Sequence, residues 1–148
     1  MANNLLKSNK TNSSVDWIQS IRGHETEAPL RVAIVGGGKA CYDLLRILDE
    51  NHLSGPNMKV LGVADINPQA PGLVYAAKLN LFATTNFEEL YDLVNLNLLI
   101  ELTGSEEVRE AILRAKPTGI SIMDHRGARF LWNLIQMEME INSTITMI

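Results

Sequence analysis

A buried strand that runs into three glycines and then into a helix constrains this chain more than any other feature. Residues 30–35, Leu-Arg-Val-Ala-Ile-Val, form a short apolar run rich in β-branched residues, as in a strand covered on both faces. Gly36, Gly37 and Gly38 follow, and residues 39–52 then repeat their apolar side chains with the period of a helix. This order predicts the opening unit of a parallel α/β sheet.

Apolar segments of strand length alternate with helical segments along the rest of the chain. Strands are predicted over residues 58–64, 81–84, 98–102 and 120–123, and helices over residues 72–79, 106–115 and 127–141, with another helix capped by Thr85 or Asn86. The alternation predicts a Rossmann-like, doubly wound α/β fold. We expect a parallel sheet of about five strands in the order 3-2-1-4-5, with helices on both faces and a ligand crevice at the carboxyl ends of strands one and four.

The chain divides into three parts by composition. Residues 1–29 are rich in Asn, Ser, Lys and Thr, and we expect a polar, partly disordered leader. Residues 30–126 form the predicted dinucleotide-binding domain, and residues 127–148 form a C-terminal helix with two apolar strips. One strip can cover the sheet while the other meets a second copy or a signalling partner. The strips are Phe130, Leu134, Met137 and Ile141, and Leu131 with Ile135.

Composition excludes several classes of function. The net charge is −4 without any cluster of Lys and Arg, which argues against a nucleic-acid partner. No apolar run is long enough to cross a bilayer, so no membrane partner is expected. Cys41 is the only cysteine, which excludes an internal disulfide and suits the cytoplasm. The single cysteine and three histidines show no metal-ligand spacing.

The glycine turn matches part of the dinucleotide-binding fingerprint G-x-G-x-x-G. Gly36 can make the tight turn out of the strand, and Gly38 lets a pyrophosphate approach the backbone. The free amides that begin the next helix would then face the phosphates. Cys41 stands where the third glycine or alanine is usual, a position that controls how closely the helix packs. The predicted phosphate-binding residues are Gly36, Gly37, Gly38, Lys39 and Ala40.

An acidic residue ends the second predicted strand. Asp65 is placed to accept hydrogen bonds from an adenosine ribose, and Ile66 follows it without a nearby Arg for a 2′-phosphate. This favours NAD over NADP. The same turn suits coenzyme A or another nucleotide as alternatives. In the plainest alternative, the glycines only form a turn and Asp65 only ends a strand.

Three segments resemble known nucleotide-binding domains: residues 32–39, 62–72 and 100–104. They are similar to the Rossmann-type domain at the N-terminus of some bacterial sensor histidine kinases, and to the cofactor domain of homoserine and aspartate dehydrogenases. The resemblance spans about residues 30–140. It implies an NAD-binding domain in which Thr103 and Gly104 lie beside the nicotinamide half of the cofactor. From the residues alone, an ordinary capped helix start is an equal alternative for this pair.

Four further residues carry groups that can do chemistry. Asp124 and His125 follow the last strand, where we expect a polar strand end whose adjacent side chains point to opposite sides. Glu101 interrupts an apolar strand and is expected to be a buried carboxylate with a structural role. Cys41 lies in the first turn of a helix, which stabilises a thiolate, although an inert buried residue is the expected outcome.

Together these features predict an NAD(H)-binding sensory or regulatory domain without catalytic activity of its own. A second hypothesis is the cofactor domain of an NAD-dependent amino-acid dehydrogenase-type oxidoreductase, truncated or completed by another chain. Thr103, Asp124 and His125 would then line its reacting end. A third hypothesis is a non-binding scaffold that dimerises through residues 127–141.

Overall fold

Strands and helices alternate along the chain in the computed structural model, which describes residues 29–50 and 58–147, with side chains up to residue 141. The predicted leader lies outside the described residues, apart from Pro29. The elements are β1 (Leu30–Val35), α2 (Lys39–Glu50), β2 (Met58–Ala64), α3 (Pro71–Lys78), β3 (Phe82–Thr84), η2 (Phe87–Asp92), β4 (Leu98–Glu101), α4 (Glu106–Ala115), β5 (Ser121–Met123) and α5 (His125–Met147).

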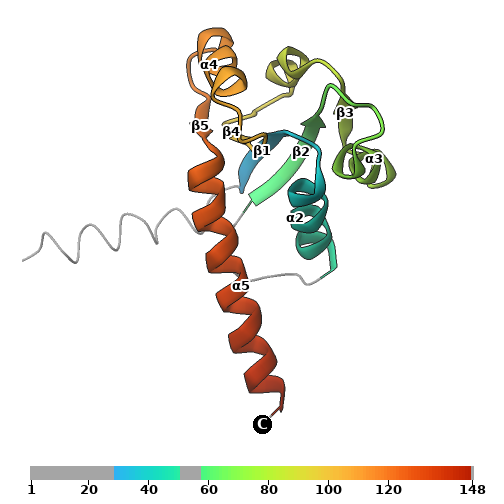
Figure 1. Ribbon diagram of the computed structural model, residues 1–148, viewed down its shortest axis with the longest axis vertical. Helices are drawn as coiled ribbons and strands as arrows, with labels where there is room; N and C mark the ends of the chain where they lie inside the picture. Colours follow the sequence, from blue (N-terminus) through green and yellow to red (C-terminus); the bar gives the residue numbers. More distant parts are fainter. Residues whose placement is uncertain (1–28, 51–57, 148) are drawn as a thin grey trace, which may run out of the picture.

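The five strands form one parallel sheet in the order β3-β2-β1-β4-β5, which confirms the predicted topology (Figure 1). Val35 at the end of β1 pairs with Ala64 of β2 on one side and with Glu101 of β4 on the other. The carboxyl ends of these three strands are therefore level. The residues that follow them, far apart in the sequence, meet at one edge of the sheet.

Helices cover both faces of the sheet, as predicted. Alternate residues of β1 point to opposite faces, so Val32 and Ile34 belong to one core, and Ala33 and Val35 to the other. The first core is closed by α2, α3 and α5, and the second by η2 and α4. A parallel sheet with helices and a hydrophobic core on each face defines a Rossmann-like α/β fold. No helix among the described residues has the length and apolarity to cross a membrane.

The last helix differs from its prediction at both ends. It begins at His125, because the Asp124 carboxylate oxygen Oδ1 accepts hydrogen bonds from the amides of Arg126 (3.1 Å) and Gly127 (3.0 Å) as an N-cap. The expected polar strand end at Asp124 and His125 is therefore wrong. The helix continues to Met147 because no Gly or Pro interrupts it after residue 141. Its C-terminal half extends beyond the sheet (Figure 1).

The two apolar strips of α5 have different environments. Ile135 is buried and Leu131 packs against the first core, so this strip covers the sheet. The side chains of the other strip are between 48% and 66% exposed. We call this second set the apolar strip of α5; its members are Phe130, Leu134, Met137 and Ile141.

The helix predicted after Thr85 or Asn86 is a short 3₁₀ helix. Asn86 is its cap, and its side chain accepts a hydrogen bond from the Glu88 amide at 3.1 Å. The Glu89 carboxylate does not accept a hydrogen bond from the Asn86 amide, which donates to the Thr84 hydroxyl oxygen. It instead accepts a hydrogen bond from the Thr84 hydroxyl at 3.0 Å. This bond ties the end of β3 to η2, which closes the second core over β2.

Candidate functional site

Gly36 makes the turn out of β1 with a left-handed backbone, φ +108°. Its amide donates a hydrogen bond to the carbonyl of Ala64 at 2.8 Å. A Cβ at this position would lie 3.0 Å from the backbone of Leu102 and Thr103. Both the conformation and the close approach therefore require glycine. Gly36 lets the chain pass between the end of β2 and the loop after β4.

Gly37 is used by the fold itself. Its amide donates to Asp65 Oδ2 at 2.7 Å, and its carbonyl accepts hydrogen bonds from the amides of Gly72 (2.6 Å) and Leu73 (3.2 Å). Both polar backbone groups of Gly37 thus have partners before any ligand binds. The backbone amides of this turn without a partner are those that follow Gly37.

Those amides belong to Gly38, Lys39 and Ala40, where α2 begins. A Cβ on Gly38 would have no atom within 4 Å, so the backbone faces open space. The described residues offer these three amides no acceptor, as expected for the first turn of a helix. No acidic side chain lies in this turn, and Lys39 adds a positive charge. The arrangement favours an anion.

Asp65 lies beside the turn, at the end of β2. Oδ1 accepts a hydrogen bond from the Asn67 amide at 2.8 Å, while Oδ2 holds Gly37. A carboxylate has about four acceptor positions, so each oxygen can still accept a hydroxyl. The next side chain, Ile66, is 89% exposed. An exposed isoleucine beside a hydrogen-bonding carboxylate suits a flat apolar ring attached to a polar sugar.

A cavity of about 300 Å³ opens at the level carboxyl ends of β1, β2 and β4. It brings together residues that the sequence predicted separately. The lining includes Gly36, Asp65, Ile66, Thr85, Phe87 and Thr103. The predicted crevice therefore exists, and the predicted residues Gly36, Asp65, Ile66 and Thr103 share it. Gly38 and Gly104 are not among the residues that line it.

Glu101 ends β4 and is fully buried. Its Oε2 accepts hydrogen bonds from the Thr103 hydroxyl and the Gly104 amide, both at 2.7 Å. Its Oε1 lies 2.7 Å from Nδ1 of His125 and 3.3 Å from the His125 amide. Burial by itself raises the pKa of the Glu101 carboxyl, but these hydrogen bonds outweigh it and hold the pKa below its ordinary value.

His125 is a functional candidate whose partner was not predicted. Because ionised Glu101 can only accept, a neutral imidazole carries its proton on Nδ1 and leaves Nε2 as an acceptor. Asp124 forms no hydrogen bond or ion pair with the ring among the described residues. It caps α5 and lies 3.6 Å from Nε of Arg109. The only signal in the sequence was the carboxylate of Glu101 inside an apolar strand, which does not identify its partner.

Cys41 is fully buried. Burial, with a smaller contribution from the negative charge of Asp65, raises the pKa of its thiol to about 12. This overturns the suggestion of a stabilised thiolate. Gly72 of α3 lies against this side chain, because a Cβ on Gly72 would meet Cys41 Cβ, Cys41 Sγ and the Gly37 carbonyl oxygen, each at 2.8 Å. Glycine on α3 thus lets this helix approach α2 closely at Cys41.

Solved structures share this fold. The chain is similar to the WlbA dehydrogenase from Chromobacterium violaceum, solved in complex with NADH and UDP-GlcNAcA, with a TM-score of 0.50 and 18% identity over 67% of this chain. It is also similar to a homoserine dehydrogenase from Thiobacillus denitrificans, with a TM-score of 0.50 and 23% identity over 78% of this chain. The matches cover 28% of each dehydrogenase.

At these identities the likeness is one of fold. No family model matches the sequence, and no curated protein sequence matches it. The class established by topology and crevice is therefore a Rossmann-like domain. The dehydrogenase part of the sequence-based resemblance has structural neighbours of the same fold. The sensor histidine kinase part stays a prediction from sequence motifs.

Proposed function

We propose that this chain is an NAD(H)-binding domain that senses or regulates, and that α5 passes the bound state to a partner. The carrying observation is that the crevice and the start of α2 both adjoin the glycine turn after β1. Free amides begin α2 at Gly38, Asp65 stands on the ribose side, and exposed Ile66 offers a surface for adenine. Thr103 and Gly104 follow β4 on the side where the nicotinamide half would lie. NADH in the complex of the WlbA dehydrogenase supports this choice of ligand.

Isothermal titration with NAD⁺, NADH, NADP⁺ and coenzyme A tests the ligand. We expect NAD⁺ or NADH to bind most tightly. If none of the four binds at about millimolar concentration, the nucleotide proposal fails. Tighter binding of coenzyme A would keep the anion site but replace its ligand.

Gly38 provides the sharpest variant. Open space surrounds its missing Cβ, and its φ lies outside the left-handed region, so Gly38→Val should fold with little loss of stability. The added side chain would occupy the space where a pyrophosphate approaches the backbone. We expect at least tenfold weaker NAD(H) binding, about 1.4 kcal/mol. An unchanged affinity in a protein with an unchanged melting temperature would place the ligand elsewhere.

The apolar strip of α5 supports transmission to a second copy of the chain. Its members are spaced four, three and four residues apart, the period of a coiled-coil seam. An identical strip on a second copy has the matching period. We therefore propose that the apolar strip of α5 packs against the same strip of a second copy in a homodimer. Light scattering should report a dimer that Leu134→Lys converts to a monomer. Gln136→Lys, on the same turn but outside the strip, should leave the dimer intact.

Sensing requires that ligand binding changes α5, because a ligand shifts an equilibrium only when it binds the two states differently. Hydrogen exchange of the amides over residues 125–141 should differ between the free and the NAD(H)-bound protein. Binding without any change in α5 would leave a cofactor domain without the sensory role.

One observation favours a second candidate, the cofactor domain of a dehydrogenase-type oxidoreductase. The Glu101–His125 pair lies beside Thr103 and Gly104, and Nε2 of His125 could take a proton from a substrate next to a nicotinamide. Oxidation of hydroxy-acid or amino-acid substrates with NAD⁺, lost in His125→Phe with NAD⁺ affinity kept, would support this candidate. Turnover that persists in His125→Phe would count against it.

A further inference from the structure

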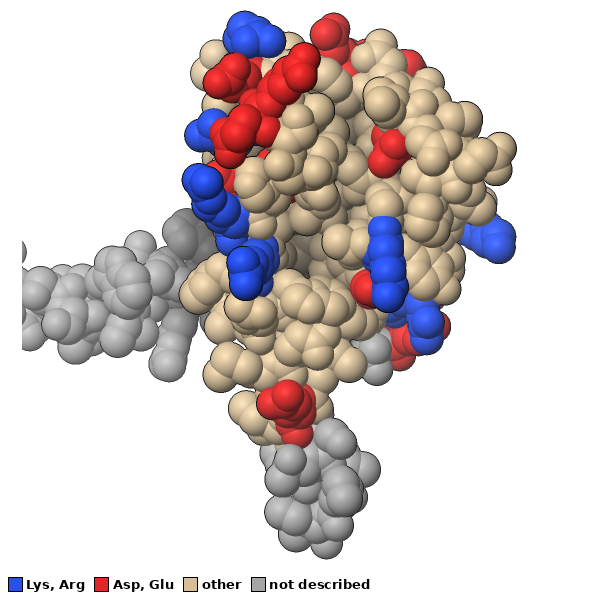
Figure 2. All heavy atoms as spheres, in the orientation of Figure 1, with Lys and Arg blue, Asp and Glu red and all other residues tan. Residues whose placement is uncertain are grey.

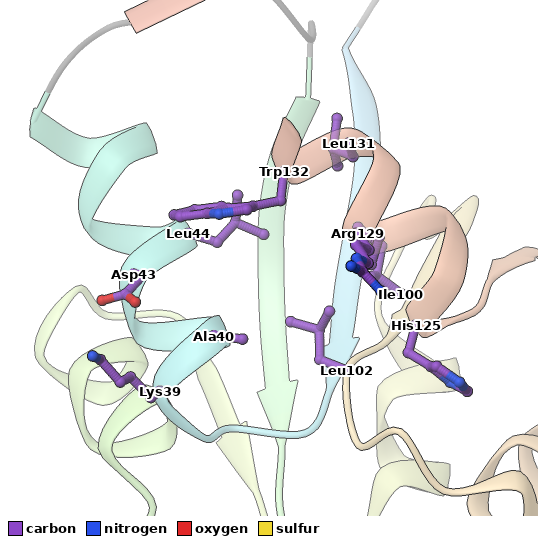
Figure 3. Close-up of a pocket in the computed structure, with 11 residues that line it drawn as sticks. Lys39, Ala40, Asp43, Leu44, Ile100, Leu102, His125, Arg129, Leu131 and Trp132 are labelled. Atoms are coloured by element: carbon purple, nitrogen blue, oxygen red, sulfur yellow. The ribbon is translucent and has the colours of Figure 1, made fainter. Parts of the chain in front are cut away.

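A second cavity, of about 430 Å³, lies on the other side of the sheet edge, between α2 and α5 (Figure 3). Its walls are Leu44 from α2, Ile100 and Leu102 from β4 and the loop after it, and Trp132 from α5. In Figure 3 the Trp132 indole extends from α5 toward α2 and lies over Leu44. Asp65 and Ile66 do not line this cavity, but Lys39 and Ala40 do, so it meets the proposed phosphate site at the start of α2.

The apolar side chains of the walls favour a ligand with an apolar part. Leu44 is buried, and Trp132 is only partly covered by the protein. A pocket of several hundred Å³ with apolar walls and a few polar groups at its rim is the usual form of a small-molecule site. Trp132 offers the face of an aromatic ring, which favours a second aromatic ring through offset or edge contacts.

The rim selects the charge of the occupant. Lys39 stands at the start of α2 and Arg129 on the first turns of α5, with Asp43 as the one acidic group. Figure 2 shows a hollow on this face with basic side chains on both sides. Among the described residues, neither Lys39 nor Arg129 forms a salt bridge. The two cations of the rim, Lys39 and Arg129, against the one carboxylate of Asp43 leave one net positive charge, which suits a monoanion.

We propose that the cavity between α2 and α5 binds a small aromatic monocarboxylate, with the ring against Trp132 and the carboxylate at Arg129. The walls supply the burial of apolar surface and the rim supplies a charge-assisted hydrogen bond. The rim shares Lys39 with the phosphate site proposed above, but the apolar walls, Leu44, Ile100, Leu102 and Trp132, do not line the crevice.

Nuclear magnetic resonance of the Trp17→Phe protein tests the proposal, because Trp132 then gives the only indole N–H signal. The probe is 3-phenylpropanoate, and 3-phenylpropanamide is its uncharged isostere. We expect the acid to shift the Trp132 signal in a saturable way, and the amide to bind at least about tenfold more weakly. No shift at about 10 mM acid, or equal affinities for acid and amide, would overturn the proposal.

Two variants locate the site. Arg129→Gln should weaken the acid at least about fivefold and leave the amide unchanged, whereas Arg126→Gln, on the same helix but outside the cavity, should change neither. Ala128→Leu places extra volume in the cavity wall and should abolish binding of both probes. The indole signal of each variant reports that it is folded. Equal losses in the Arg129 and Arg126 variants would show a general charge effect and overturn the assignment.

Discussion

The imidazole of His125 lies 2.7 Å from the buried carboxylate of Glu101, and this contact joins the end of β4 to the start of α5. Oε2 of the same carboxylate accepts hydrogen bonds from Thr103 and Gly104. One side chain therefore fixes the loop after β4 and the first residue of the helix that we propose as the output of the domain. A displacement of the loop after β4 would therefore alter the start of α5, and the reverse.

The first prediction concerns this carboxylate. In Glu101→Gln a single amide oxygen replaces two carboxylate oxygens that together accept four hydrogen bonds, so buried donors lose their acceptor. We expect a loss of about 1–3 kcal/mol in the free energy of unfolding, measured by urea denaturation at neutral pH. A variant as stable as the parent protein would mean that the network contributes nothing to folding.

The stability contributed by Glu101 should depend on pH. Its pKa is lower in the folded chain than its ordinary value of 4.5, so its contribution is fully present above pH 4.5 and is lost as the pH falls through the folded pKa. The difference in stability between the parent protein and Glu101→Gln should therefore shrink on acidification. Asp124, whose pKa is also lowered, chiefly by the hydrogen bond from the Gly127 amide, acts in both proteins and cancels from the difference.

The contact between Gly72 and Cys41 gives the next prediction. Gly72→Ala would place a Cβ 2.8 Å from Cys41 and from the Gly37 carbonyl oxygen. Overpacking of this kind costs about 1–3 kcal/mol. Cys41→Gly in the same chain removes the side-chain clash but leaves the carbonyl clash, so thermal denaturation should show a partial recovery. A fully stable Gly72→Ala protein would contradict the packing of α3 on α2.

The thiol of Cys41 should be unreactive in the native protein. It is fully buried, and burial raises its pKa to about 12, so the reactive thiolate is absent near neutral pH. Ellman's reagent should modify it only after the protein is unfolded in guanidinium. Rapid modification under native conditions would show that the thiol becomes exposed by movement of α2, and would support a redox role for Cys41.

With NAD(H) as the proposed ligand, Asp65 should control the choice between NAD and NADP. The negative carboxylate beside the ribose position repels a 2′-phosphate. Asp65→Asn keeps an acceptor for the Gly37 amide but removes the charge. We expect the preference for NAD⁺ over NADP⁺ in isothermal titration to fall by at least tenfold, about 1.4 kcal/mol. An unchanged preference would show that the 2′-hydroxyl of the bound cofactor does not lie beside Asp65.

The sheet could be predicted from local patterns because each buried strand is a short apolar run that ends at a glycine, an acid or a turn. Parallel strands and short connections then leave few orders for five strands. The start of α5 was missed for a local reason, since Asp124 after an apolar run is compatible with a strand end as well as with a helix cap. Only the three-dimensional course of the chain distinguishes them.

The candidate site was predictable where its residues follow strand ends, as Gly36, Asp65 and Thr103 do. The Glu101–His125 pair was not, because it depends on the register of β4 with β5, in which Ile100 pairs with Met123. The hydrogen bonds of Gly37 could not be predicted either. Its amide donates to Asp65, and its carbonyl accepts from the amides at the start of α3. Both contacts join segments that no spacing rule connects.

The contact between Cys41 and Gly72 bears on how such domains are recognised in genomes. A search pattern that demands glycine or alanine at the third fingerprint position rejects this sequence, although its two helices approach one another closely enough to exclude a methyl group from residue 72. A pattern that accepts cysteine at this position together with a glycine on the facing helix would retain this sequence.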